Sequence, residues 1–199
     1  MGKQWIEDLT KAQIGIELIR LKVFQNKIEL ISTEDQETLI CKWLDQYSGI
    51  DLIGKKNDNL MTMACRIQWD KNYKTFTIRY KRTSGAKTEY EKRIEAIEKG
   101  YLYPGWTMQA YMNGMFDNNN KLIDEKSLKI LGCAVIRTDV LYKFINEEKI
   151  IFHNTANHEG NEFIYVYWDH IKQLNSFWQY ERNNKIYFAP KQIELKFEL

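Results

Sequence analysis

Charged and apolar side chains alternate along two neighbouring stretches of the chain, and this pattern could assemble a chemically active surface. Period-two alternation is typical of strands. It places Arg66 and Gln68 on one face of the first strand, and Arg79 and Lys81 on one face of the second. Asp51 stands between two apolar residues at the beginning of an earlier strand. The sequence therefore predicts a single sheet whose one face gathers a carboxylate, an amide and several cations, as a phosphate-handling site requires.

The positive charge of the chain is concentrated in this same region. The whole chain of 199 residues has a net charge of +2. Between positions 51 and 93, eleven Lys and Arg residues stand against five Asp and Glu, so this segment carries +6 and the remainder −4. A basic segment within a near-neutral protein indicates a local anionic partner. A solvated surface explains any one of these charges equally well, and it is their clustering that indicates the partner.

Length and composition predict one globular domain with its own core. Only two prolines and ten glycines occur, and neither forms a linker-like run. We expect a single domain over 1–199, made of an N-terminal appendage (1–32), a core (33–112), and C-terminal strands with short helices (113–199). The three cysteines are far apart, which indicates reduced thiols in a cytoplasmic protein. The absence of a long apolar run predicts no membrane association.

Local signals predict most of the secondary structure. The apolar spacing near the N-terminus favours a helix that ends near Phe24, although a hairpin over 19–30 remains an alternative. Thr88 and Glu91 form a capping-box pattern before a helix that Gly100 would end. The central order is helix (33–47), three strands (49–82), helix (88–99) and strand (106–112). Further elements are expected at 128–136 (strand), 139–145 (helix, capped by Thr138), 150–152, 163–168 and 186–188 (strands).

Two groups of apolar residues receive specific interpretations. In the helix over 33–47, a stripe is expected to be buried, and it consists of Leu39, Ile40, Trp43, Leu44 and Tyr47. The aromatic residues that alternate over 163–168 are interpreted first as part of the core or of a surface that contacts a partner. The second interpretation is a platform on which bases stack. The three histidines are scattered and predict surface or capping positions rather than a zinc site.

The central αβββαβ order, with an Asp at the beginning of its first strand, resembles the PD-(D/E)xK nuclease superfamily over roughly the middle half of the chain. The resemblance implies an α/β fold of the restriction-endonuclease type, with a mixed central sheet flanked by helices and here with extra C-terminal strands. It also implies an endonuclease or phosphodiesterase that uses Mg²⁺ or Mn²⁺ and acts on nucleic acid, DNA rather than RNA. Small members of the superfamily are common in phages and mobile elements, which suggests such an origin. A homodimer is compatible with this interpretation.

The resemblance assigns roles to individual residues. Asp51 matches the metal-binding Asp, and Glu37 lies where a helix carboxylate would join it. The second-strand motif departs from the family, because the acid-x-Lys position reads Arg66-Ile67-Gln68. Gln68 can replace the acid, since a carbonyl oxygen can ligate Mg²⁺. The metal ligands implied are Asp51, Gln68 and Glu37.

The Lys that should follow is absent, because Asp70 occupies its position. In some members of the superfamily the missing catalytic groups come from other elements. By this resemblance, residues of the next strand and the following helix would complete the site. The implied catalytic set is Asp51, Gln68, Lys81, Glu89 and Lys92. The cations that fit phosphate contacts better than catalysis are Arg66, Arg79, Arg82, Lys87 and Arg93.

The alternative is a catalytically inactive protein with a nuclease-like fold that sequesters an anionic ligand or blocks a partner protein. Arg66 supports it, because a guanidinium at the acid position repels a metal ion. This alternative predicts anion binding by the basic face without hydrolysis.

Overall fold

The computed structural model describes most of the backbone, namely residues 3–34, 38–69, 71–118, 121–157, 159–174, 176–181 and 185–188. Within these ranges, side chains are described from residue 11 to residue 180. Glu37 and Asp70 therefore lie outside the described residues.

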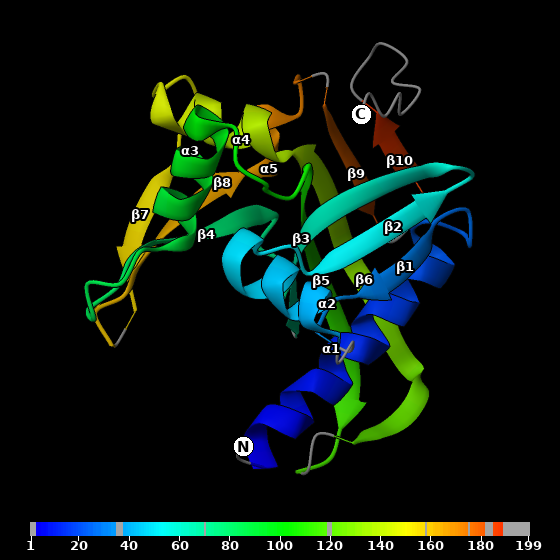
Figure 1. The fold of residues 1–199 in the computed structure, drawn as a ribbon. Coiled ribbons are helices and arrows are strands. Elements are labelled where there is room, and N and C mark those ends of the chain that lie inside the picture. The colour runs from blue at the N-terminus through cyan, green and yellow to red at the C-terminus, as the bar shows by residue number, and fades with distance from the viewer. Residues whose placement is uncertain are drawn as a thin grey trace.

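The protein has an α/β fold in which a large mixed sheet is flanked by helices (Figure 1). In spatial order, the strands of this sheet among the described residues are β1 (Glu29–Ser32), β2 (Leu52–Lys56), β3 (Asn59–Trp69), β5 (Trp106–Phe116), β6 (Leu122–Arg137), β9 (Phe177–Glu181) and β10 (Lys185–Phe188). Strands β3 and β5 are parallel, and the other neighbouring pairs are antiparallel.

A smaller antiparallel sheet consists of β4 (Thr75–Lys81), β8 (Glu162–Tyr167) and β7 (His153–Ala156), in that order. The helices are α1 (Lys3–Lys22), α2 (Leu39–Trp43), α3 (Glu89–Lys99), α4 (Thr138–Asn146) and α5 (Trp168–Ile171). Helix α2 continues into a π-helical turn, η1 (Leu44–Ser48). Among the described residues, no helix combines the length and the apolarity that crossing a bilayer requires.

Alternate residues of the central strands face two separate cores. On β6, Cys133 and Val135 belong to the core beneath α1, together with Ile19. Ala134 and Ile136 belong to the core that the smaller sheet, α4 and α5 share with the opposite face. Alternate residues of these strands are therefore buried on both sides, because other elements cover each face of the large sheet. All three cysteines are free, and Cys133 is fully buried.

The prediction that one sheet carries all the polar residues of 49–82 is wrong, because β4 leaves the large sheet and pairs with β8. The alternation of β4 determined which side chains share a face but not which strand would be the neighbour. The two sheets are joined by a hydrogen bond of 3.4 Å from the Thr77 amide to Gln109 Oε1. Polar residues of β3 and β5, in the large sheet, consequently face polar residues of β4, in the smaller sheet.

The helix predicted over 33–47 begins later than expected. Thr38 is the N-cap of α2, and its Oγ1 accepts from the Cys41 amide. Thr33 is buried and donates its hydroxyl to the Ile50 carbonyl at 2.6 Å. The predicted burial of the apolar stripe is also wrong, since four of its members are 52–76% exposed: Leu39, Ile40, Trp43 and Tyr47. Helical spacing shows that residues share a face, but not that another element covers it.

Other local predictions are confirmed or corrected. Helix α1 ends close to Phe24, which confirms the predicted N-terminal helix. The alternative hairpin over 19–30 is wrong, because β1 pairs with β2. The capping box of Thr88 and Glu91 is present. Thr138 is the first residue of α4 rather than its cap, and its Oγ1 lies 2.9 Å from Thr107 Oγ1. Strand β7 begins at His153 instead of covering 150–152, and β9 was not predicted.

Two glycines that end helices in the left-handed conformation offer a matched test of packing around η1. At Gly49 (φ 58°), an added Cβ would collide with the Arg93 guanidinium, whereas at Gly100 (φ 67°) it would meet no atom within 4 Å. We expect Gly100→Ala to cost about 1 kcal/mol of unfolding free energy, from backbone strain alone. Gly49→Ala should cost roughly 2–4 kcal/mol, because overpacking is added. Urea unfolding of both variants measures the difference, and equal costs would contradict the packing described here.

Candidate functional site

A polar cavity of about 350 Å³ lies between the large sheet and the unit formed by β4 and α3. Its walls come from η1, β3, β4, α3 and β5, so elements distant in sequence supply one surface. Seven of the lining residues are charged: Asp45, Asp51, Glu89, Arg66, Arg79, Arg82 and Arg93. This is hereafter called the arginine cavity.

The arginines of this cavity outnumber the carboxylates that balance them. Arg66 Nη2 is 3.0 Å from Glu89 Oε2. Tyr142 is fully buried and donates its hydroxyl to Glu89 Oε1 at 3.0 Å. Burial lowers the pKa of Arg79, and the nearby Arg82 and Arg66 lower it further. Several guanidinium groups around one cavity are a preorganised site for an anion, since an anion would relieve their repulsion.

Two buried guanidinium N–H groups on this wall have no hydrogen-bond partner among the described residues, and they are Arg82 Nε and Arg93 Nε. Arg93 is only 5% exposed. Its Nη2 donates to the Gly49 carbonyl at 2.7 Å and its Nη1 donates to the Ser48 carbonyl, so the residue also holds η1 in place. Buried donors are nearly always satisfied in folded proteins. Unsatisfied donors in a cationic cavity fit an anionic ligand.

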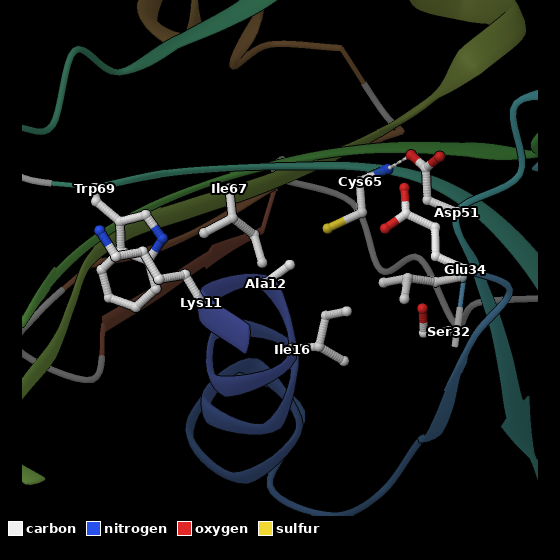
Figure 2. A pocket seen from close by; sticks show the side chains of 10 residues that line it. Lys11, Ala12, Ile16, Ser32, Glu34, Asp51, Cys65, Ile67 and Trp69 are labelled. Carbon is white, nitrogen blue, oxygen red and sulfur yellow. Dashed lines mark hydrogen bonds between the residues drawn. The ribbon is translucent and has the colours of Figure 1, made fainter. Parts of the chain in front are cut away.

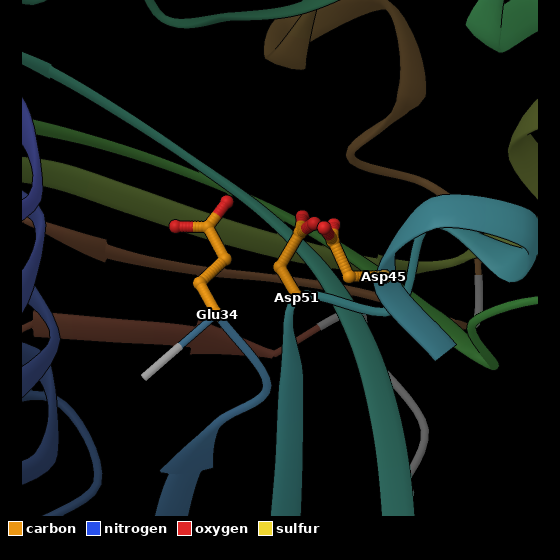
Figure 3. Close-up of side chains that lie close together, drawn as sticks. All are labelled: Glu34, Asp45 and Asp51. Carbon is orange, nitrogen blue, oxygen red and sulfur yellow. The ribbon is translucent and has the colours of Figure 1, made fainter. Parts of the chain in front are cut away.

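Three carboxylates lie close together (Figure 3), and two of them, Asp45 and Asp51, line the arginine cavity. One oxygen from each of Glu34, Asp45 and Asp51 lies within 4.8 Å of the others. Glu34 follows β1, Asp45 belongs to η1, and Asp51 precedes β2, so the cluster forms only when these segments converge. Asp51 Oδ2 accepts a 2.6 Å hydrogen bond from the Cys65 amide, which orients its carboxylate.

The environment of Asp51 raises its pKa from 3.8 to about 7. Burial is the largest cause, and Glu34 and Asp45 add repulsion, whereas the Cys65 amide and Arg93 act in the opposite direction. Burial also raises the pKa of Asp45, which Lys92 opposes. A carboxylate under repulsion binds a cation or a proton readily.

A second cavity, of about 300 Å³, lies on the other side of Asp51, between α1 and the large sheet (Figure 2). Its middle is apolar, with Ala12 and Ile67 among the lining residues, while Lys11 and Glu34 line opposite ends. Asp51 and Cys65 line both cavities. Asp51 therefore stands where the two cavities meet.

The acidic cluster fits a hard divalent cation in donor chemistry. Mg²⁺ and Mn²⁺ prefer carboxylate oxygens, and three such groups converge here. Of the two predicted ligands that the structure describes, Asp51 belongs to this cluster and Gln68 does not. Gln68 lines a different cavity, where its Oε1 accepts from Gln109 Nε2 at 3.1 Å. Sequence reasoning missed Glu34 and Asp45, because nothing local indicates that the end of β1 and η1 approach Asp51.

Apart from Gln68 and Glu37, the predicted site residues divide into two groups. The structure gathers six of them around the arginine cavity: Asp51, Arg66, Arg79, Arg82, Glu89 and Arg93. The lysines lie elsewhere on the surface. Lys81 pairs with Glu162 at 3.1 Å, and Lys87 pairs with Glu95. Lys92 is exposed on α3, and its charge lowers the pKa of Asp45.

Comparison of the chain with protein-family models, with curated proteins and with solved structures finds no match. The interpretation of the site therefore rests on its own geometry.

Proposed function

We propose that the protein is a metal-dependent, nuclease-like phosphodiesterase that binds nucleic acid, DNA in the first instance. The arginine cavity holds a backbone phosphate, and the adjoining carboxylates hold a divalent cation beside it. The observation that carries this proposal is the position of Asp51, which belongs to the acidic cluster and also lines the arginine cavity. Phosphate and metal would thus be neighbours, as phosphodiester hydrolysis requires.

Support for a restriction-endonuclease-like core comes from the order of α2, β2, β3, β4, α3 and β5. Asp51 directly precedes β2, and the connection through α3 makes β5 parallel to β3. The position of β4 in a second sheet is a departure from the family pattern.

Some residues of this chain would bind the cation and the phosphate, and Asp51 would also release a proton. A divalent cation at the cluster would supply Lewis-acid polarisation of the phosphate and a more acidic bound water. Arg66, Arg79 and Arg82 would contact the non-bridging oxygens and balance charge that develops on them. Glu89 orients Arg66 through their 3.0 Å ion pair. Asp51, with a pKa of about 7 in the absence of a cation, would release its proton near neutral pH when the cation binds.

The direct test is cleavage of end-labelled single- and double-stranded DNA and RNA with Mg²⁺ or Mn²⁺. We expect hydrolysis that EDTA abolishes and that Glu34→Gln and Asp45→Asn reduce by roughly tenfold or more, because each removes one charged ligand. Asp169→Asn is the control, since Asp169 lies on the surface of α5 with its side chain 77% exposed. Cleavage that is indifferent to EDTA would refute the proposed metal centre.

A second candidate, a catalytically inactive binding protein, is favoured by one specific observation. Two of the groups expected to act in catalysis are already engaged: Glu89 by Arg66 and Tyr142, and Lys81 by Glu162. This candidate predicts salt-dependent binding of nucleic acid or another polyanion without turnover under any metal condition. Measured turnover that depends on the acidic cluster would eliminate it.

A further inference from the structure

We infer that a third cavity, beside the arginine cavity, binds a nucleobase of the strand whose phosphate the arginines hold. The inference rests on the proposed function and specifies how its ligand is recognised. This base cavity has a volume of about 530 Å³ and lies between the smaller sheet and the end of β3. Its walls include Gln68, Thr77, His153, Tyr165 and Tyr167.

The base cavity and the arginine cavity share a wall made of two amide side chains. Gln68 lines the former and Gln109 the latter, and Gln109 Nε2 donates to Gln68 Oε1 at 3.1 Å. Gln109 is 1% exposed and is further held by the Thr77 amide, which donates to its Oε1 at 3.4 Å. Thr77 lines both cavities. Two ligand groups covalently joined to each other, such as the phosphate and base of a nucleotide, can therefore occupy both at once.

The chemical character of the base cavity differs from that of its neighbour. None of its described lining residues is Asp, Glu, Lys or Arg. A cavity without formal charge is unsuited to a second phosphate or to a metal ion. The lining instead combines hydroxyl groups, one amide and several rings, which suits a neutral, planar, hydrogen-bonding group.

The rings of the base cavity are accessible rather than packed into a core. Tyr167 is 42% exposed and Tyr73 is 53% exposed. The His153 ring stands edge-on to Tyr167, with centroids 5.4 Å apart and an interplanar angle of 85°. Lys71 Nζ lies 5.1 Å from the centroid of the Tyr73 ring, so a cation stands close to this wall. Accessible tyrosine rings next to a phosphate site are the usual platform for stacking an unpaired base.

Gln68 supplies a directional contact to the same cavity. Its Oε1 is engaged by Gln109, and its Nε2 has no hydrogen-bond partner among the described residues. An amide N–H₂ in this situation can donate to an acceptor on a base edge. The residue that the resemblance assigned to the metal is thus placed to read a base.

The test compares two single strands of equal length in EDTA, so that cleavage does not intervene: oligothymidylate and its abasic analogue. We expect the abasic strand to bind roughly tenfold more weakly, because stacking is lost. Tyr167→Leu should remove most of this preference, with an unchanged salt dependence. The matched control is Tyr101→Leu, because Tyr101 is 59% exposed and does not line the cavity. Circular dichroism of both variants verifies that they fold.

The outcomes separate this inference from the proposed function. Equal affinity for the two strands would overturn the base cavity and leave phosphate binding intact. Undetectable binding of both strands at low salt would overturn the proposed function itself. Thymidine monophosphate that binds as tightly as the oligonucleotide would identify a free nucleotide as the occupant, which contradicts the assignment to a strand.

Discussion

Asp51→Asn is expected to abolish cleavage while making the protein more stable at neutral and alkaline pH. The folded protein raises the pKa of Asp51 from 3.8 to about 7. A raised carboxyl pKa means that stability is fully present below about pH 4 and is lost as the pH rises through 7. At 1.36 kcal/mol per pKa unit the loss has an upper bound of about 4 kcal/mol. Because Asp51 is half-buried and solvent screens part of its charge, we expect about 1–2 kcal/mol.

The asparagine variant avoids this loss and keeps the contact that orients the side chain. The Asn carbonyl oxygen can accept from the Cys65 amide as Asp51 Oδ2 does. The stabilisation relative to wild type should therefore grow from about pH 4 to pH 7 and then level off. Urea unfolding over this range measures it. A difference that stays constant with pH would show that Asp51 has an ordinary pKa.

A divalent cation should affect the two proteins differently. Mn²⁺ or Mg²⁺ should raise the Tm of wild type above pH 7, because binding to the folded state stabilises it. The Tm of the variant should change little on addition of the cation, since the side chain at position 51 no longer carries a charge. Its cleavage rate should fall by at least about 100-fold. Activity lost in a more stable protein cannot be attributed to unfolding, which makes this variant more informative than Asp51→Ala.

Arg79→Gln is expected to weaken nucleic acid binding by about tenfold at moderate salt without destabilising the fold. Burial, together with the charges of Arg82 and Arg66, lowers the pKa of Arg79. Removing its charge relieves repulsion in the free protein but would also remove the proposed phosphate contact. The slope of log K against log salt should fall by about one unit. The charge of Arg79 thus favours binding of the strand but disfavours the stability of the free protein.

The matched control is Arg137→Gln. Arg137 pairs with Asp139 at 2.7 Å and does not line the arginine cavity. Fluorescence anisotropy with a labelled strand at several salt concentrations compares the two variants with wild type. An Arg79→Gln protein that binds as wild type does would remove the arginine cavity from the phosphate-binding surface. An equal loss in Arg137→Gln would indicate a general charge effect.

Local chemistry in the sequence determined several features that the structure confirms. Thr88 and Glu91 satisfy the first amides of α3, and Gly100 accepts the left-handed conformation that ends it. Arg66 and Gln68 share a face of β3 because alternate residues of a strand must do so. Asp51 stands immediately before the apolar strand β2, as its place between Ile50 and Leu52 indicated. Each of these features depends on residues only a few positions apart.

Only the tertiary structure decided which of these features meet. β4 could pair with any strand of compatible alternation, and its partner β8 lies far along the chain. Glu34 and Asp45 join Asp51 because β1 aligns beside β2 and Arg93 holds η1 by its carbonyls. Trp43 and Tyr47 share a helical face, yet no described element buries them. Periodicity along a chain specifies the direction of side chains, whereas long-range packing selects their neighbours, and the candidate site consists of such neighbours.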